Sequence, residues 1–397
     1  MPAPDPAAGL AALEAAGLRR RRRVVEPGHR AGTLTVDGLE LVDFSSNDYL
    51  GLARDSRLAE AMADSARRDG AGSGASHLVT GHRSAHHALE ERLAAWCGRE
   101  QALLFSTGYM ANLGLASALV GSGDRVLEDR LNHASLLDAG LLSRARFARY
   151  GHADSAALER RLERPAGGRT LVLTDGVFSM DGDVAPLPGL AAACRRHDAL
   201  LAVDDAHGLG VIGPTGRGSL EQHGLGQQDV PLLVGTLGKA FGSFGAFVAG
   251  PAPLIDWLIQ RARTYLYTTA LPPPVAATTL AALDLADQES WRRERCLALT
   301  QRFRAGALRA GLALTPSVTP IQPVIVGDAT ATLAASAALQ ERGFLVVAIR
   351  PPTVPLGSAR LRVTLSAALD EADVDGLVAA LAEVLPARQS EARHHAA

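Results

Sequence analysis

Val234-Gly-Thr-Leu-Gly-Lys-Ala-Phe-Gly242 contains Lys239, the only lysine in a chain of 397 residues. Lysine and arginine total 40, so the other 39 basic residues are arginines. An arginine side chain keeps its proton, whereas the amine of a lysine can lose it and attack a carbonyl carbon to form a Schiff base. Lys239 therefore predicts an aldehyde cofactor, pyridoxal phosphate (PLP). The alternative is that a single lysine remains by chance in a chain whose composition favours arginine.

A second group of polar residues precedes this stretch. Asp204-Asp-Ala-His207 follows an apolar run that predicts a buried strand. A buried carboxylate such as Asp204 can hold the proton on a pyridinium nitrogen, which makes the ring an electron sink. We expect His207 and Ser179 to contact the phenolic oxygen of the same ring, and His133 to stack on its other face. Each residue alone is typical of an ordinary strand end, but together with the only lysine they favour a PLP site.

Apolar runs alternate with helical patterns through most of the chain. The predicted strands cover residues 102–105, 125–127, 170–174, 200–203, 232–234 and 245–249. Such alternation predicts an α/β fold with a mainly parallel sheet flanked by helices, in which ligands gather at the carboxyl ends of the strands. We expect an N-terminal helix and strand segment over residues 1–44, a large PLP-binding domain over 45–288 and a small α+β domain over 289–397.

Two glycine-rich stretches are predicted to bring the backbone close to a ligand. Ser106-Thr-Gly108-Tyr109 separates a short strand from a helix, the geometry in which free backbone N–H groups hold a phosphate. Residues 70–81 contain too many glycines for a helix or a strand interior and are expected to form a loop. Gly208-Leu-Gly-Val-Ile-Gly213 matches a dinucleotide-binding pattern, but Pro214 follows where the helix should begin, so a nicotinamide site is not expected.

Histidine and cysteine spacing gives no indication of a metal centre. His82 and His86 are spaced as metal ligands on a helix can be, but the sequence has no HExxH pattern and no third ligand beside them. A surface or packing role is therefore favoured for both, and no metal site is expected. The cysteines are odd in number and lack ligand spacing, so they are expected to be reduced packing residues; they are Cys97, Cys194 and Cys296.

Overall charge excludes some classes of partner. A net charge of −2 gives no electrostatic case for binding nucleic acid. The run Arg19–Arg23 is a local exception, which predicts either a solvated helix face or contact with an anionic substrate. The N-terminus lacks a basic start followed by an apolar segment, and no apolar run reaches about 18 residues. We expect a soluble, cytoplasmic protein that does not bind membranes.

Five motifs together resemble the α-oxoamine synthases. They are Asn47-Asp-Tyr-Leu-Gly-Leu52, Gly176-Val-Phe-Ser-Met-Asp-Gly-Asp183, Asp204-Asp-Ala-His-Gly208, Gly213-Pro-Thr-Gly-Arg-Gly218 and Thr236-Leu-Gly-Lys-Ala-Phe-Gly242. The resemblance covers most of the chain and implies a PLP-dependent homodimer of the aspartate-aminotransferase-like fold (fold type I). Within residues 70–81, Ala75 and His77 stand where the family usually has Gly and often has Arg.

The resemblance also implies roles for single residues. The catalytic residues would be Lys239, which forms the Schiff base, together with His133, Asp204 and His207. The cofactor would be bound by Gly108, Tyr109, His133, Ser179, Asp204, His207, Thr236 and Lys239. Its phosphate would lie on the backbone of Gly108 and Tyr109 and on the hydroxyl of Thr236.

The substrates are implied by Ala348-Ile-Arg-Pro-Pro-Thr-Val-Pro355, which is similar to the family member that acts in biotin biosynthesis. That member condenses L-alanine with a pimeloyl thioester, carried by CoA or acyl carrier protein, and loses carbon dioxide. The substrate-binding residues would be Asn47 and Arg362 for the amino-acid carboxylate, Arg21 and Thr353 for the acyl chain, and His133. One alternative is a sister enzyme that joins glycine to a short acyl-CoA. A catalytically silent homologue is disfavoured, because every expected cofactor residue is present.

Overall fold

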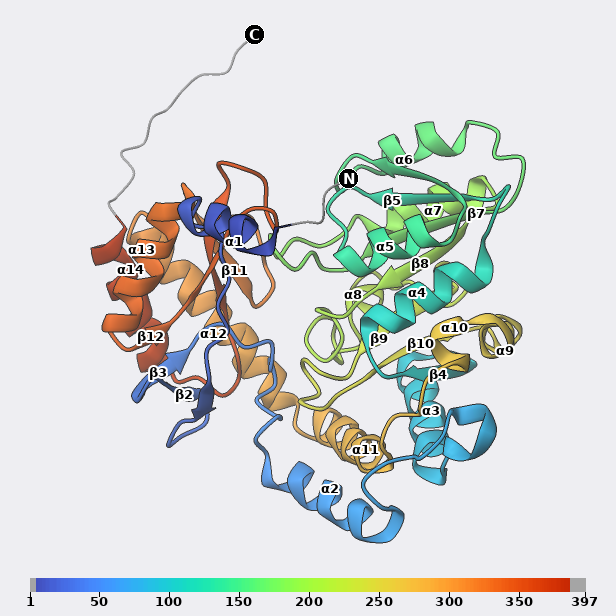
Figure 1. The fold of residues 1–397 in the computed structure, drawn as a ribbon, viewed down its shortest axis with the longest axis horizontal. Helices are drawn as coiled ribbons and strands as arrows, with labels where there is room; N and C mark the ends of the chain where they lie inside the picture. Colours follow the sequence, from blue (N-terminus) through green and yellow to red (C-terminus); the bar gives the residue numbers. More distant parts are fainter. Residues whose placement is uncertain (1–4, 386–397) are drawn as a thin grey trace. The chain divides into compact units, whose positions relative to one another are not determined.

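The computed structural model describes residues 5–385 and divides the chain into two compact units. The larger unit contains residues 48–179 and 183–294, and the smaller contains the residues up to Asn47, residues 180–182 and those from Arg295 onward. Figure 1 shows the elements of both units. In the described part of the chain no helix is long and apolar enough to cross a membrane.

The larger unit is built on a seven-stranded sheet with the strand order β4-β10-β9-β8-β7-β5-β6 (Figure 1). Its strands are β4 (Gln101–Phe105), β5 (Arg125–Asp129), β6 (Arg146–Tyr150), β7 (Thr170–Asp175), β8 (Leu200–Asp204), β9 (Leu232–Thr236) and β10 (Ala246–Gly250). All neighbouring strands are parallel except β10, which is antiparallel to both β4 and β9. The mainly parallel sheet predicted from the sequence is therefore confirmed.

Helices accompany these strands, and each strand from β4 to β8 is connected to the next along the chain by a helix. They are α2 (Ser56–Asp69), η1 (His77–Gly81), α3 (Ser84–Cys97), α4 (Gly108–Leu119), α5 (Ala134–Leu142), α6 (Ser155–Leu162), α7 (Leu187–Arg196), α8 (Ser219–Gln222), α9 (Ala252–Arg261), α10 (Arg263–Leu266) and α11 (Pro273–Gln288). One core joins α4 and α5 to the sheet through residues such as Leu115, Leu136 and Val248, each at most 2% exposed. This packing fixes the positions of the strand ends, and the polar side chains of the site lie at those ends.

Register places two carboxylates side by side at one edge of the sheet. Asp175 ends β7, Asp204 ends β8, and the two residues are paired in register. Strand β9 ends at Thr236, three residues before Lys239. The polar residues predicted at strand ends are thus gathered at the carboxyl edge of the parallel strands, where ligands of such sheets bind.

The smaller unit contains two sheets. The first has the order β1-β2-β3-β12 and the second the antiparallel order β11-β14-β13. Their elements, with the helices, are α1 (Pro6–Ala15), β1 (Val25–Pro27), β2 (Thr33–Val36), β3 (Leu39–Asp43), β11 (Ile321–Gly327), α13 (Ala329–Glu341), β12 (Phe344–Leu345), β13 (Val347–Ile349), β14 (Ala359–Thr364) and α14 (Glu371–Val384). Helix α12 (Ser290–Arg309) contains the boundary at Arg295. Because β3 pairs with β12, the N-terminal strands belong to the same unit as the C-terminal residues.

Three local predictions differ from the structure. The run Arg19–Arg23, for which a helix face was one of the two predictions, lies outside α1. This helix ends at Ala15, because Gly17 adopts φ 64° and the five consecutive arginines follow. The predicted loop over residues 70–81 ends in the π-helix η1, so its last five residues are helical. Strand β6 was missed, because Arg146-Phe-Ala-Arg-Tyr150 is a partly exposed edge strand rather than an apolar run. The segment after Gly213 forms turns and the short helix α8, as expected for a chain without a dinucleotide site.

Candidate functional site

A cavity of about 200 Å³ lies at the carboxyl ends of β7, β8 and β9 in the larger unit. Its lining residues are Gly108, Tyr109, His133, Ser135, Asp175, Ser179, Asp204, Ala206, His207, Gly235, Thr236 and Lys239. Every residue that the sequence predicted for cofactor binding is among them. The structure therefore gathers these residues, which are spread over more than a hundred positions of the chain, around one space.

Lys239 is held by a turn that leaves its amine at the cavity. Leu237, Ala240 and Phe241 on either side are buried, and Phe241 packs edge-on against Trp96. Gly242 adopts φ 61°, and a side chain there would meet the backbone of Ala53 at 2.4 Å. The two glycines in Gly-Lys-Ala-Phe-Gly242 thus allow a tight turn that anchors the backbone around a half-buried lysine.

The amine of Lys239 is the end of a short hydrogen-bonded chain. Its Nζ lies 2.8 Å from Nε2 of His207, and Nδ1 of His207 lies 2.6 Å from the hydroxyl of Tyr49. Tyr49 is fully buried. This arrangement fixes the plane of the His207 ring, because both ring nitrogens have a defined partner.

Asp204 is a buried carboxylate held by an amide. Its Oδ2 accepts a hydrogen bond of 2.7 Å from Nδ2 of Asn112, which also donates to Oγ of Ser135 at 2.9 Å. Its Oδ1 accepts the backbone N–H of Ala206. Among the described residues no arginine lines the cavity, so no guanidinium of the lining pairs with Asp204. A positively charged group of a ligand can therefore lie beside this carboxylate.

Asp175 lies next to Asp204 and behaves differently. Burial, and then the charge of Asp204, raise the pKa of Asp175 well above its ordinary value. Oδ2 of Asp175 accepts the backbone N–H of His133 at 2.7 Å. Asp175 therefore holds its proton more tightly than an ordinary carboxyl does, and the charge of its neighbour Asp204 contributes to that shift.

His133 caps the helix that follows it. Its Nδ1 lies 2.7 Å from Oγ of Ser135 and accepts from the backbone N–H of that residue at the start of α5. Burial lowers the pKa of His133, against the opposing charge of Asp204. A neutral, fixed imidazole facing a cavity is suited to pack against a planar ring.

The opposite end of the cavity is suited to an anion. Gly108 and Tyr109 are the first two residues of α4, whose initial N–H groups have no partners within the helix. Thr107 caps this helix by accepting the Met110 N–H at 3.1 Å. The hydroxyl of Thr236 accepts the Gly238 N–H at 3.3 Å. The side chain of Tyr109 donates to Asp138, so the backbone of Tyr109 is the part available to a phosphate.

The substrate residues predicted from the sequence lie in the smaller unit, apart from His133. Oδ1 of Asn47 is 3.2 Å from both terminal nitrogens of Arg362, which is 7% exposed on β14. Thr353 accepts from Arg20 at 3.2 Å, whereas Arg21 pairs with Glu14. Arg20, the neighbour of the predicted Arg21, is therefore the residue that contacts Thr353 in this structure.

Four further residues complete the site and were not given roles from the sequence. They are Tyr49, Asn112, Ser135 and Asp175. Asp175 follows a predicted strand, which was a signal that could have selected it. Tyr49 and Asn112 are 158 and 92 positions from their partners His207 and Asp204, so only the fold shows that they meet.

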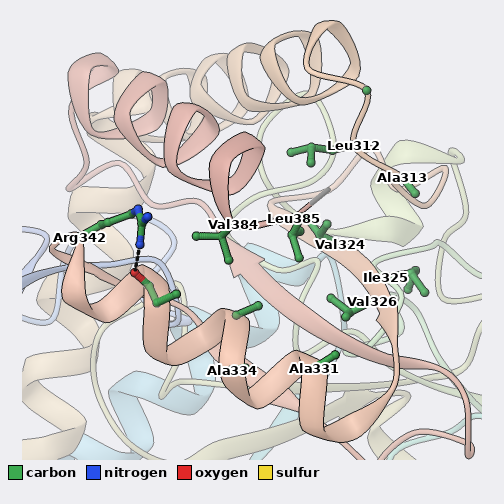
Figure 2. A pocket seen from close by; sticks show the side chains of 13 residues that line it. Leu312, Ala313, Val324, Ile325, Val326, Ala331, Ala334, Arg342, Val384 and Leu385 are labelled. Carbon is green, nitrogen blue, oxygen red and sulfur yellow. Dashed lines mark hydrogen bonds between the residues drawn. The ribbon is translucent and has the colours of Figure 1, made fainter. Parts of the chain in front are cut away.

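Two other features lie outside this cavity. In the smaller unit an apolar cavity of about 560 Å³ is lined by α13, β11 and the end of α14, with Arg342 as its one charged side chain among the described residues (Figure 2). Near the start of α3, the rings of His77, His82 and His86 form a cluster. The expectation that no third ligand lies beside His82 and His86 is therefore wrong: the π-helical turn brings His77 to them.

Comparison with known sequences gives a consistent family. The profile of the family Aminotransferase class I and II matches residues 40–381. An 8-amino-7-oxononanoate synthase of Alkalilimnicola ehrlichii is 62% identical, over 95% of this chain and 96% of that protein. The enzyme of the same name from Methylococcus capsulatus is 59% identical, over 96% of this chain and 98% of that protein.

Solved structures agree with the fold. A serine palmitoyltransferase of Sphingomonas wittichii has a TM-score of 0.91 and 32% identity, over 96% of both chains. A serine palmitoyltransferase of S. paucimobilis with PLP bound has a TM-score of 0.90 and 30% identity, over 95% of this chain and 96% of that one. An 8-amino-7-oxononanoate synthase of Francisella tularensis has a TM-score of 0.75 and 29% identity, over 86% and 97%.

Proposed function

We propose that the substrates of this protein are L-alanine and a pimeloyl thioester. The premise is that the chain belongs to the aminotransferase class I and II family and has the 8-amino-7-oxononanoate synthase activity of biotin biosynthesis. PLP is the cofactor. The acyl chain is carried by CoA or acyl carrier protein, and the products are 8-amino-7-oxononanoate, carbon dioxide and the free thiol. The observation that carries the proposal is the cavity in which Lys239 faces Asp204 and the α4 N-terminus.

The residues around this cavity fit PLP by their chemistry. Asp204 would hold the proton of the ring nitrogen, since a buried carboxylate held by Asn112 needs a cation beside it. The N–H groups of Gly108 and Tyr109 and the hydroxyl of Thr236 would hold the phosphate. Ser179 and His207 would contact the phenolic oxygen, and His133 would pack on the ring face.

Bound PLP supplies an electron sink that stabilises negative charge at Cα of the amino acid. Lys239 would bind the cofactor and, once its amine is free again, would remove the proton from Cα of alanine. His207 orients that amine through its Nε2, 2.8 Å away. Asp204 would hold the proton on the ring nitrogen of the cofactor through its carboxylate, which Asn112 orients. The deprotonated Cα would attack the thioester carbonyl, and the thiol would leave. The carboxylate of the former alanine would then depart as carbon dioxide, and Cα would take up a proton in its place.

The amino-acid carboxylate is assigned to Arg362 and Asn47. Arg362 is a nearly buried cation whose fork is aligned by the Asn47 amide oxygen and by Thr364, 3.0 Å from Nη1. A guanidinium fixed in this way binds a carboxylate in two-point contact. Because the side chain of alanine is only a methyl group, its carboxylate is the charged group that Arg362 and Asn47 would recognise.

The distal carboxylate of the pimeloyl chain is assigned to Arg21 and Thr353. Arg21 is mostly exposed and shares Glu14 with Arg19, so it can exchange that pair for a substrate. Thr353 contacts Arg20 rather than Arg21, which makes Arg20 a second candidate cation for this carboxylate. The proposal therefore predicts that both arginines affect the acyl substrate.

The active protein is proposed to be a cytoplasmic homodimer in which residues 45–288 form the PLP-binding domain, between segments 1–44 and 289–397. Residues 265–272 are the segment expected to reach the partner's cofactor. Tyr265 is 4% exposed, whereas Tyr267 is 73% exposed and offers the hydroxyl for such a contact. Activity that stays constant per chain on dilution to a monomer, measured by light scattering, contradicts this assembly.

Product analysis tests the proposed substrates. Purified protein with PLP is supplied with pimeloyl-CoA and pimeloyl-acyl carrier protein, each with L-alanine, glycine and L-serine, and products are identified by mass spectrometry. We expect 8-amino-7-oxononanoate only with L-alanine. Faster turnover of acetyl-CoA with glycine would instead support the sister enzyme.

A further inference from the structure

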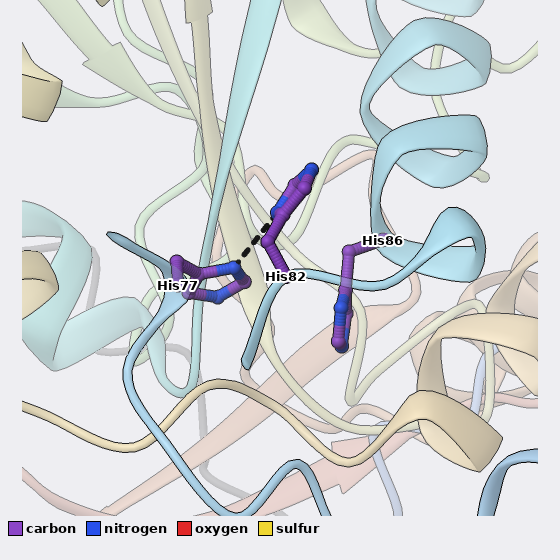
Figure 3. A group of neighbouring side chains, drawn as sticks. All are labelled: His77, His82 and His86. Carbon is purple, nitrogen blue, oxygen red and sulfur yellow. Dashed lines mark hydrogen bonds between the residues drawn. The ribbon is translucent and has the colours of Figure 1, made fainter. Parts of the chain in front are cut away.

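Figure 3 shows the histidine cluster at the start of α3, and none of its three residues lines the cavity around Lys239. One ring nitrogen each of His77, His82 and His86 lies within 4.8 Å of the other two. The centroids of the rings are 5.3 Å apart for His77 and His82, 5.1 Å for His77 and His86, and 5.7 Å for His82 and His86. Three imidazoles thus face one small volume.

We propose that His77, His82 and His86 bind a divalent transition-metal ion of the zinc class. Zinc takes imidazole nitrogens at about 2.0–2.1 Å in a tetrahedral arrangement, which places two such nitrogens about 3.4 Å apart and their ring centroids about 5 Å apart. Nδ1 of His77 and Nδ1 of His82 are 3.0 Å apart. Because this distance and the centroid distances are close to those values, the rings need to move little to hold an ion.

The orientation of His86 identifies its ligand atom. Nε2 of His86 lies 2.6 Å from the backbone carbonyl of Leu271. A carbonyl only accepts, so Nε2 carries the hydrogen and Nδ1 carries the lone pair. Metal-bound histidines usually donate their other ring N–H to such a carbonyl. The ion would replace one existing contact, the hydrogen bond of 2.9 Å that Nδ1 accepts from the Arg83 N–H.

His77 and His82 provide the other two ligands and the route of entry. His77 is 7% exposed and stacks on Tyr265 with ring centroids 5.0 Å apart, so its ring is already ordered. The side chain of His82 is 31% exposed. Both line a cavity of about 510 Å³ through which an ion can reach them. A change of tautomer in one of these two neutral rings frees both Nδ1 lone pairs without net loss of a proton.

A second possible ligand set shares His82 with His87 and Glu90. The side chain of His87 is 67% exposed and lies 3.4 Å from Glu91. Oε1 of Glu90 accepts the Leu104 N–H at 3.0 Å. Ordering an exposed histidine costs side-chain entropy that the packed rings of His77 and His86 do not lose, so the three-histidine set is favoured.

Zinc binding to the holoenzyme tests the proposal. Chelator-treated protein with PLP retained is titrated with ZnCl2 by calorimetry, and its metal content is measured after gel filtration. We expect one ion per chain, and affinity lowered at least about 10-fold in both His77→Gln and His82→Gln, as loss of a ligand commonly causes. His223→Gln, an exposed histidine outside the cluster, is the matched control and should bind as the unmodified protein does.

A second measurement separates ligation from a folding defect. Added Co2+ should give the visible absorption of a tetrahedral site, at wavelengths longer than those of the cofactor, and His82→Gln should lack it. Circular dichroism without metal should be unchanged in that partly exposed variant. No stoichiometric zinc binding, or unchanged affinity in both variants, overturns the proposal. Loss of binding in His87→Gln or Glu90→Gln with full binding in His77→Gln would assign the ion to the second set and overturn it as well.

Discussion

The hydroxyl of Tyr49 lies 2.6 Å from Nδ1 of His207, on the side of the imidazole remote from Lys239. A phenol donates more readily than it accepts, so this contact favours the tautomer of His207 with hydrogen on Nε2. That hydrogen points at the Lys239 nitrogen, 2.8 Å from Nε2. Tyr49 therefore acts on the lysine through the histidine, as a positioning residue.

The first prediction concerns this chain of contacts. Tyr49→Phe removes the hydroxyl that contacts Nδ1 of His207, and loss of such a buried hydrogen bond costs about 1–3 kcal/mol. We expect PLP to combine with Lys239 about 5- to 100-fold more slowly in apoenzyme, measured by stopped-flow absorbance. Tyr150→Phe removes a buried tyrosine hydroxyl outside the cavity lining and serves as the control. Equal rates in both variants would show that Tyr49 has only a packing role.

The second prediction concerns Lys239 itself. Lys239→Ala should bind PLP weakly and lack the visible absorption of lysine-bound cofactor, because no other lysine exists in the chain. Lys239→Arg should lack it too, since a guanidinium keeps its proton and cannot attack the aldehyde. Borohydride reduction followed by mass spectrometry checks both variants. A covalent adduct in either one contradicts the assignment.

The third prediction separates Asp204 from cofactor binding. Asp204→Asn should retain much of the PLP, because the phosphate contacts are elsewhere, but should exchange the Cα proton of alanine several orders of magnitude more slowly. Exchange into deuterated water, followed by NMR, measures this step without the acyl substrate. Asp205→Asn is a useful comparison, because burial raises the pKa of Asp205 to about 7 and its carboxylate accepts from Ser219, away from the cavity lining. Near-normal exchange in Asp204→Asn refutes the role.

The fourth prediction concerns the acyl substrate. A charge-assisted contact contributes about 1.5–3 kcal/mol, so Arg21→Ala should lower kcat/KM for the pimeloyl thioester about 10- to 100-fold. The spectral change on binding alanine should persist. Arg20→Ala tests the contact with Thr353 seen here, and Arg22→Ala controls for the loss of one positive charge. Unaltered kinetics in both Arg20→Ala and Arg21→Ala would remove this segment from the acyl site.

The fifth prediction is a pH dependence of stability. His152 lies 2.9 Å from both Asp129 and Asp183, which, against the effect of burial, raise the pKa of His152 from 6.5 to about 10. The folded state then holds this proton more tightly than the unfolded state. The resulting stabilisation is complete below about pH 6.5 and is lost as the pH rises towards about 10.

Urea unfolding at pH 7 and pH 9 measures this loss. We expect the free energy of unfolding of the unmodified protein to be lower at pH 9 than at pH 7. The decrease should be smaller in His152→Gln. His29→Gln, whose side chain is 95% exposed, should behave as the unmodified protein. The same fall in all three proteins would show that other groups cause the dependence.

Sequence patterns were most informative where one local rule decided the structure. The buried runs before Asp175, Asp204 and Thr236 predicted strands, and parallel pairing alone brings their ends to one edge. The turn at Lys239 was not predicted from the sequence, although Gly238 and Gly242 flank it. These rules placed the predicted cofactor residues around one cavity.

The patterns failed where the structure depends on contacts made after folding. Nothing in the neighbourhood of Tyr49 or Asn112 reveals their partners, because those lie in strands and turns far along the chain. Glycine-rich residues 70–81 favoured a loop, yet their last turn is stabilised by packing of His77 between Tyr265 and two histidines. The spacing of His82 and His86 could not show that His77, from the preceding π-helical turn, lies beside them.

The anchored turn around Lys239 also determines how the chain can be cut. A protease that cleaves only after lysine has a single target, the peptide bond between Lys239 and Ala240, and would yield fragments 1–239 and 240–397. Leu237, Ala240 and Phe241 are buried beside that bond, so cleavage requires the turn to open. The rate of this one cut in native protein is therefore a direct measure of how often the catalytic turn opens, and of how firmly a bound cofactor closes it.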